Sequence, residues 1–133
     1  MQTYCVFCGI ARHERDAVTV YENEEFIVFL DKYPLTLGHA LVAPKKHYTN
    51  IFDMPEEAAA RAFVLAKKVA AAQLKALGAK GVRIVMNNGR EAGQEIMHAH
   101  VHVIPYGVPH LGRRELDREE GERVASLLRR ELA

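Results

Sequence analysis

The chain has 133 residues, of which 49% are hydrophobic and 26% are charged, as is ordinary for one folded domain with its own core. Its formal net charge of +1 excludes the broad positive surface that binds a nucleic-acid duplex. No apolar run is long enough to span a bilayer, and the N-terminus lacks the basic and apolar regions of a signal peptide. We therefore expect one domain, residues 1–133, in the cytoplasm, with neither a duplex nor a membrane as its partner.

Three short strands are expected in the first third of the chain. Val18–Tyr21 and Phe26–Leu30 are rich in β-branched and aromatic residues, and the polar residues between them suit a hairpin. Pro34 and Gly38 mark a loop, after which His39–Pro44 is predicted to be the third strand.

A long helix is predicted from Met54 to Leu77. Asp53 is a good N-cap residue with Glu56 three residues later, and Gly78 is a natural stop at the C-terminal end. Helical spacing predicts an apolar stripe on this helix, formed by Phe63, Ala66, Ala70, Leu74 and Leu77.

The second half of the chain is expected to hold two further strands and a closing helix. The strands are predicted at Val82–Met86 and Met97–Ile104, and the helix over about residues 114–132, where Gly121 costs about 1 kcal/mol relative to Ala. The order of hairpin, strand, helix, strand, strand and helix favours an α+β domain with a mostly antiparallel sheet.

The most unusual feature is the alternation of His98, His100 and His102 with the apolar residues Ala99 and Val101. In a strand, alternate residues share one face, and their backbones lie about 6.6 Å apart. One zinc ion, which binds nitrogen at about 2.0–2.1 Å, could gather all three imidazoles only if the strand bent strongly. Separate roles are easier: one histidine on a metal, one as a nucleophile and one bound to an oxygen.

A neutral imidazole is abundant near pH 7 and is nucleophilic, so a histidine can attack phosphorus and split one difficult step into two. Its reacting nitrogen must be unprotonated, so another group must hold the proton on the other ring nitrogen. The alternative interpretation is a solvated strand face that is merely rich in histidine. The pair Cys5 and Cys8, taken alone, could be a redox pair, half of a zinc site, or neither.

These residues resemble the histidine triad (HIT) family, and in particular its zinc-containing bacterial members of the Hint and Fhit type. The family motif, His-x-His-x-His followed by apolar residues, stands here at residues 98–104. Three further blocks resemble the family in the same order: residues 5–10, residues 38–47 and residues 87–95. The resemblance runs from about residue 4 to 105 and leaves about residues 106–133 uncovered.

The resemblance implies a homodimer in which each chain adds a five-stranded antiparallel sheet, one long helix and a C-terminal helix to a continuous sheet. It also implies nucleotidyl hydrolase or transferase chemistry on a purine nucleotide. His100 would take up AMP covalently before water releases it, and His102 and His39 would contact the α-phosphate or the bridging atom.

The resemblance also implies the binding residues. An apolar slot for the base would be formed by Val6, Phe7, Ile10, Phe29 and Leu30. Asp31 would bind the ribose hydroxyls, and the phosphates would meet Asn87, Gly93, Gln94 and His102. A structural zinc would be held by Cys5, Cys8, His47 and His98, a closed set that leaves no position for a catalytic water.

Two departures from the family pattern leave the leaving group open. Glu95 stands where many relatives have Ser or Thr, and Tyr106 stands where Fhit-like members often have Arg. Nucleoside phosphoramidates and dinucleoside polyphosphates both remain as substrates. Two other functions also remain: a nucleotide-binding regulator with incidental turnover, and a metallohydrolase that uses triad histidines as catalytic metal ligands.

Overall fold

The computed structural model describes residues 5–133, so residues 1–4 of the expected domain lie outside it. Its elements are α1 (Val6–Ala11), β1 (Thr19–Glu22), β2 (Phe26–Leu30), β3 (Ala40–Pro44), the short 3-10 helix η1 (Ile51–Asp53), α2 (Glu56–Leu77), β4 (Gly81–Val85), the 3-10 helix η2 (Arg90–Ala92), β5 (Val101–Tyr106) and α3 (Arg118–Leu132). The strands form one five-stranded antiparallel sheet in the order β1-β2-β3-β5-β4. The predicted α+β fold is confirmed. Within residues 5–133, no helix is long and apolar enough to cross a membrane.

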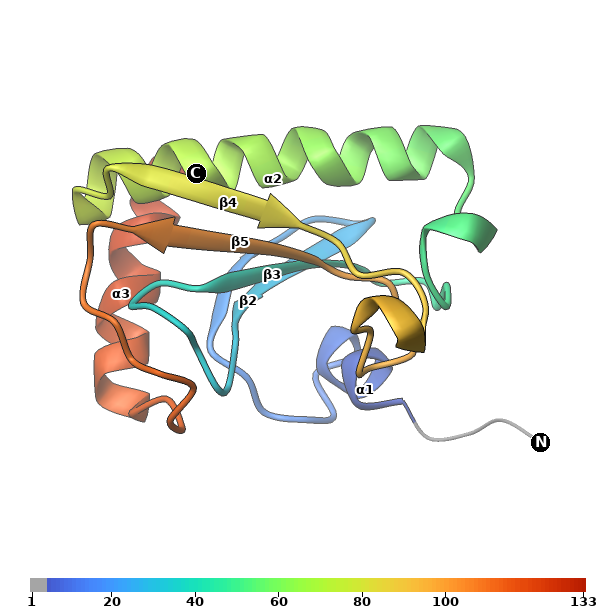
Figure 1. Ribbon diagram of the computed structural model, residues 1–133, viewed down its shortest axis with the longest axis horizontal. Coiled ribbons are helices and arrows are strands. Elements are labelled where there is room, and N and C mark those ends of the chain that lie inside the picture. Colours follow the sequence, from blue (N-terminus) through green and yellow to red (C-terminus); the bar gives the residue numbers. More distant parts are fainter. Residues whose placement is uncertain (1–4) are drawn as a thin grey trace.

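The sheet is covered differently on its two faces (Figure 1). On one face, α2 and α3 pack over the main core, to which β2 contributes Phe26 and Val28. On the other face, Ile27 and Phe29 meet α1 in a smaller core. Because alternate residues of a strand point to opposite faces, the uninterrupted apolar run of β2 reflects burial on both sides.

The long helix is present, but its start and its buried face differ from the prediction. It begins at Glu56, after Pro55 at the N-cap position, whereas Asp53 is the last residue of η1 and closes its capping box by accepting from the Thr49 and Asn50 N–H groups. The buried face is formed by Ala58, Ala62, Leu65, Ala66, Val69, Ala72 and Gln73. Phe63 and Leu74 are 38% and 47% exposed. Four small alanines on the buried face let α2 lie close to the sheet, and Phe63 and Leu74 lie off this face.

The triad strand also starts later than predicted. β5 begins at Val101, so His98 and His100 precede it, and the chain bends at residues 96–98. Its pairing with β3 ends at Val101, opposite Val42, and the Ala99 N–H bonds to the Tyr48 carbonyl instead. Pro44, near the end of β3, has no N–H with which to prolong the ladder. The other predicted strands are each present, and their ends move by one or two residues at most.

Two features of the chain ends were not predicted. The six-residue α1 follows Cys5, whose Sγ accepts the Cys8 N–H. The C-terminal helix begins only at Arg118, capped by Asp117. Gly121 lies where a Cβ atom would come within 2.9 Å of the Leu116 side chain, so its small size permits close packing and offsets its poor helix propensity.

Residues 107–117 return along the loop that follows β2. The N–H groups of Leu111, Arg113 and Leu116 bond to the carbonyls of Leu35, Pro34 and Lys32 in turn. These bonds bring a segment from outside the motif blocks to the edge of the histidine-bearing face.

One polar side chain of α2 fixes the sheet beneath the histidines. Gln73 is fully buried, and its Nε2 donates to the Gly38 and Val103 carbonyls at 3.0 Å each. These carbonyls belong to the residues next to His39 and His102. Gln73 therefore joins β3 and β5 at the place where the two histidines meet on the opposite face.

Candidate active site

A cavity of ≈ 780 Å³ opens on the face of the sheet that carries α1. This volume lies within the range of small-molecule sites. Of the predicted residues, the cavity is lined by Val6, Phe7, Ile10, Phe29, Leu30, Asp31, Asn87, Gly93, His100 and His102. Residues from α1, β2, the loop before β5 and β5 itself therefore line one cavity.

The cavity has an apolar end and a polar end. At the apolar end, the Phe7 ring lies edge-on to Phe29, with centroids 5.2 Å apart, and to His100 at 5.0 Å. The polar end brings Asn87 and Gly93 to the same cavity as the histidines. Such a division suits a ligand with a flat apolar part and an anionic part.

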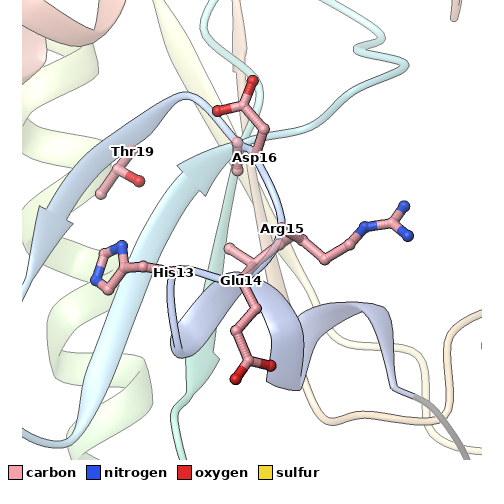
Figure 2. Close-up of a pocket in the computed structure, with 7 residues that line it drawn as sticks. His13, Glu14, Arg15, Asp16 and Thr19 are labelled. Atoms are coloured by element: carbon pink, nitrogen blue, oxygen red, sulfur yellow. The ribbon is translucent and has the colours of Figure 1, made fainter.

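A second, smaller hollow of ≈ 250 Å³ lies beside the turn after α1 (Figure 2). Its labelled side chains, His13 to Asp16 and Thr19, spread outward from the turn and from the start of β1. His13 is bonded to Glu22 at 2.8 Å, and most of this wall is exposed. The hollow contains no member of the triad, so it is not the candidate active site.

The proton of the His100 ring is placed by a backbone group. His100 Nδ1 lies 2.7 Å from the His98 carbonyl oxygen, which can only accept, so Nδ1 must carry the hydrogen. In the neutral ring Nε2 is then unprotonated. The carbonyl that the sequence analysis required is therefore present.

A second relay fixes His102 in the opposite tautomer. The Leu35 N–H donates to His39 Nδ1 at 3.1 Å, so a neutral His39 must carry its proton on Nε2. That Nε2–H donates to His102 Nδ1 at 3.0 Å. His102 is left with a proton on Nε2, so it is a hydrogen-bond donor next to His100, whose ring centroid is 5.0 Å away.

Burial keeps these rings neutral. Burial lowers the pKa of His39 to about 3 and that of His102 to about 4, and neighbouring cations add to both effects. Burial also lowers the pKa of His100, although the His98 carbonyl, Asp31 and Glu95 act against it. At neutral pH the tautomers derived above are therefore the populated forms.

His39 and Gln94 are placed differently from the prediction, because neither lines the cavity. His39 is fully buried, and its Nε2 lies 3.0 Å from His102 Nδ1 and 3.5 Å from an Asp31 carboxylate oxygen, so it can act only through these two side chains. Gln94 is 4% exposed, and its Nε2 donates to the Thr49 and Ile96 carbonyls, while its Oε1 accepts the Gly89 N–H. Gln94 thus holds the loop in shape, and the neighbouring Gly93 and Glu95 form the wall.

Asp31 stands between the two ends of the cavity and has a partner that the sequence did not reveal. Its carboxylate accepts the Tyr33 N–H and lies 3.9 Å from the Arg113 guanidinium. Burial raises the pKa of Asp31, while the Tyr33 N–H and Arg113 oppose that rise. Arg113 comes from the segment after β5, so no local pattern could place it here.

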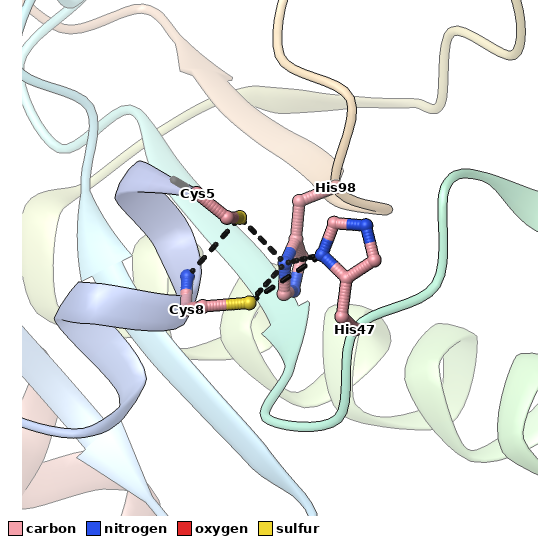
Figure 3. A group of neighbouring side chains, drawn as sticks. All are labelled: Cys5, Cys8, His47 and His98. Carbon is pink, nitrogen blue, oxygen red and sulfur yellow. Dashed lines mark hydrogen bonds between the residues drawn. The ribbon is translucent and has the colours of Figure 1, made fainter. Parts of the chain in front are cut away.

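Cys5, Cys8, His47 and His98 converge, as Figure 3 shows. The cysteine sulfurs lie 3.3 and 3.5 Å from His98 Nδ1, and the two histidine Nδ1 atoms are 3.2 Å apart. Ligands of one tetrahedral zinc lie roughly 3.3 to 3.8 Å apart, given bonds of about 2.0 Å to nitrogen and about 2.3 Å to sulfur. His98 Nε2 donates to the Pro44 carbonyl, so its Nδ1 offers a lone pair to this centre. The residues fit a zinc ion.

Asp31, His39 and His102 also lie close together, but they fit a metal poorly. His39 could ligate through Nε2 only if its proton moved to Nδ1, where it would face the Leu35 N–H. The tautomer therefore opposes a catalytic metal at this place.

Comparison with known proteins identifies the fold family. Residues 12–107 match the HIT domain. The chain belongs to the HIT domain family. This HIT protein is similar to a hypothetical histidine triad nucleotide-binding protein from Sulfolobus tokodaii, with a TM-score of 0.90, 38% identity, and coverage of 96% of this chain and 91% of that one.

Two further similarities bear on chemistry. A Zn-bound histidine triad family protein from Mycobacterium smegmatis has a TM-score of 0.86 and 38% identity, covering 96% of this chain and 92% of that one. Adenylylsulfatase HINT3 from Arabidopsis thaliana is 37% identical over 105 residues, which are 79% of this chain and 53% of the relative. The HIT family membership predicted from the sequence is confirmed.

The buried His39 makes stability depend on pH. Its folded pKa of about 3 lies below the ordinary value of 6.5, so as pH falls the unfolded state binds the proton first. Its stabilising effect is full above pH 6.5 and is lost as the pH falls toward 3. We expect the free energy of unfolding, measured with urea, to lose about 1.4 kcal/mol per pH unit from this group in that range.

In His39→Gln the free energy of unfolding should depend less steeply on pH than in the wild type. In His110→Gln, a change at an exposed histidine, it should depend on pH as in the wild type. If His39→Gln does not fold, His102→Gln should show the same flattening, since His102 has a folded pKa of about 4. Identical slopes in all of these proteins would show that His39 and His102 are not neutral through burial.

Proposed function

We propose that this HIT protein is a nucleotide hydrolase or transferase that acts at the α-phosphate of a purine nucleotide through a nucleotidyl-histidine intermediate. One observation carries the proposal. A single cavity of nucleotide size holds an unprotonated nitrogen, Nε2 of His100, beside a protonated one, Nε2 of His102. The Arabidopsis relative, named as an adenylylsulfatase, supports chemistry on a nucleotide.

In the first step, His100 Nε2 attacks the α-phosphorus and the bond to the leaving group breaks. The electron pair of the broken bond stays with the leaving atom, which accepts a hydrogen bond from His102 Nε2–H and takes its proton from water in the cavity. The His100 ring becomes positively charged, and its Nδ1–H remains bonded to the His98 carbonyl, which stabilises this charge. His102 stays neutral and stabilises the charge that develops on the leaving atom.

In the second step, water attacks the same phosphorus and the bond to His100 Nε2 breaks. The proton of this water passes to solvent, and His100 returns to its first state with Nε2 unprotonated. His39 takes part only by position: its Nε2–H holds His102 Nδ1 as an acceptor, so the Nε2–H of His102 remains available as a hydrogen-bond donor.

The rest of the cavity would bind and orient the nucleotide. The apolar end around Phe7 and Phe29 suits a flat base, and the Asp31 carboxylate can accept from both ribose hydroxyls. Asn87 and the Gly93 backbone would contact the phosphates. His39 and Gln94 then support the site from behind, although the family resemblance placed them on the phosphate.

We further propose a structural zinc on Cys5, Cys8, His47 and His98. When bound, the ion would fix the start of α1 and the position of His98, whose carbonyl holds His100. Burial, and next the adjacent Cys5, raise the pKa of the Cys8 thiol to about 11 where no cation is present, so a cation would favour the thiolate ligand. The closed ligand set opposes the metallohydrolase alternative.

A homodimer joined through β4 is proposed from two exposed features. β4 is an edge strand of the sheet, and Ile84 on it is 40% exposed. Val64 and Leu74 of α2 are 54% and 47% exposed. An open edge beside apolar side chains is a template for pairing with another chain. The cytoplasmic location and the extent of the single domain remain predictions.

Replacing the nucleophile tests the covalent mechanism. His100→Gln should lower turnover of an adenosine 5′-phosphoramidate by at least about a thousandfold, because no covalent path remains. Intact-mass analysis of the wild type, quenched early, should show one added AMP on a peptide that contains His100. Tight nucleotide binding with no adduct and negligible turnover would favour the regulator. Turnover that depends on an added metal, with no adduct, would favour the metallohydrolase.

Removing a zinc ligand tests the metal site. Native mass spectrometry should find one zinc per chain in the wild type and none in a Cys8→Ser variant. Exchange of zinc for cobalt should change turnover by less than about twofold, because the ion is closed off from substrate. Wild-type protein isolated without zinc, or cobalt protein with greatly altered turnover, would contradict a structural zinc.

Sedimentation tests the dimer. The wild type should sediment as two chains, and Leu74→Arg should shift it toward one chain because a charge would be buried in the interface. Leu74→Met keeps an apolar side chain and is the matched control. A wild type that sediments as one chain would exclude the dimer.

A further inference from the structure

Glu95 is held at the cavity wall by the loop that precedes it. Gly93 adopts a left-handed conformation, with φ +94°, and the buried Gln94 is tied to three backbone groups. The next residue, Glu95, is exposed and lines the same cavity as His100 and His102. The loop is anchored on both sides of this carboxylate, so Glu95 occupies a defined part of the site.

The charges around the nucleophile are not balanced. Asp31 has Arg113 at 3.9 Å. Across residues 5–133, no hydrogen bond or ion pair is formed by the Glu95 side chain. The charged groups that act on the His100 ring are Asp31 and Glu95, and both favour a positive charge there.

Most basic residues of the cavity wall have partners of their own. Arg113, whose charge acts on His39 and His102, faces the Asp31 carboxylate. Arg118 is paired with Asp16 and with Glu122, and Lys32 lies over the Tyr33 ring. Arg15 belongs to the turn after α1 (Figure 2). Enzymes that expel a phosphate or sulfate normally neutralise the outgoing anion with Arg, Lys or a metal ion. Glu95 occupies the wall with the opposite charge.

We propose that Glu95 determines specificity, by favouring leaving groups that carry a positive charge close to the scissile bond and disfavouring anionic ones. The proposal rests on the function proposed above and deepens it. The favoured substrate class is a nucleoside 5′-phosphoramidate whose amine portion bears a further ammonium group.

Glu95 is not needed as the proton donor. The P–N bond breaks as the bond from His100 Nε2 forms, and the departing nitrogen accepts a hydrogen bond from His102 Nε2–H. The amine leaves with the electron pair of the broken bond, and solvent supplies its protons. The Glu95 carboxylate takes no part in the proton transfers and acts only by its field on the departing group.

Three substrates that share adenosine, phosphate and a P–N bond test this role. The amine portions are diaminopropane, butylamine and β-alanine, which place an ammonium, a neutral or a carboxylate group at a similar distance from phosphorus. For the wild type, kcat/KM should fall in that order, with a difference of about tenfold between the first and the last, as expected for one partly exposed charge. Added salt should reduce the difference.

The test variant is Glu95→Gln, and the matched control is Glu91→Gln, which makes the same change on the same loop outside the cavity. Glu95→Gln should bring the three kcat/KM values within about twofold of their intrinsic order, whereas Glu91→Gln should keep the wild-type preference. The intrinsic order is taken from the acid hydrolysis rates of the same compounds without enzyme.

Two failures are distinguishable. If the wild type forms the His100 adduct but shows no charge preference, or if Glu95→Gln keeps the preference, the role of Glu95 is refuted and the proposed function stands. If the neutral butylamine substrate gives neither adduct nor product, the proposed function fails, and the specificity proposal fails with it.

Discussion

The chemistry of this site depends on the placement of one proton on each of three neutral imidazoles, and backbone groups make that choice. The Leu35 N–H can only donate and the His98 carbonyl can only accept. Between them they fix His39, His102 and His100 in tautomers that give one nucleophilic nitrogen and one donor. Because burial lowers the pKa of all three rings, they stay neutral at neutral pH and keep these tautomers.

The backbone fixes these tautomers only because β3 and β5 are held in register near their ends. Leu41 of β3 lies opposite His102 of β5, which brings His39 close to His102. The regular ladder stops soon afterwards, since Pro105 has no N–H to donate. Side chains take over: Thr36 Oγ1 donates to the Pro105 carbonyl at 2.6 Å, and Gln73 bridges the Gly38 and Val103 carbonyls from the other face. The buried polar groups of the core thus keep the catalytic strands at a fixed separation.

The sequence predicted the parts of the site that follow from local spacing. Alternation placed the triad beside one another, and the ligand set for zinc followed from the family resemblance. Position within a loop could not be predicted, because it depends on distant hydrogen bonds. Gln94 turns inward since Thr49 and Gly89 offer partners there, and His39 lies behind His102 since Leu35 binds its Nδ1. Periodicity alone also failed to show which face of α2 packs on the sheet. The buried face is rich in alanine, and alanine is a weaker indicator of burial in a sequence than the larger apolar residues Phe63 and Leu74.

Contacts between segments far apart in sequence were also beyond prediction. Arg113 reaches Asp31 only because residues 107–117 fold back along the loop after β2. Apart from residue 107, that segment lies beyond the residues that match the HIT domain. The position of Glu95 also depends on such contacts, because the loop that carries it is held by Gln94 and Asn88, which bond to distant backbone groups. Under the proposed function, the fold would separate two tasks: buried hydrogen bonds would set the reactivity of His100, and exposed residues of the cavity wall would set the charge that a departing group meets.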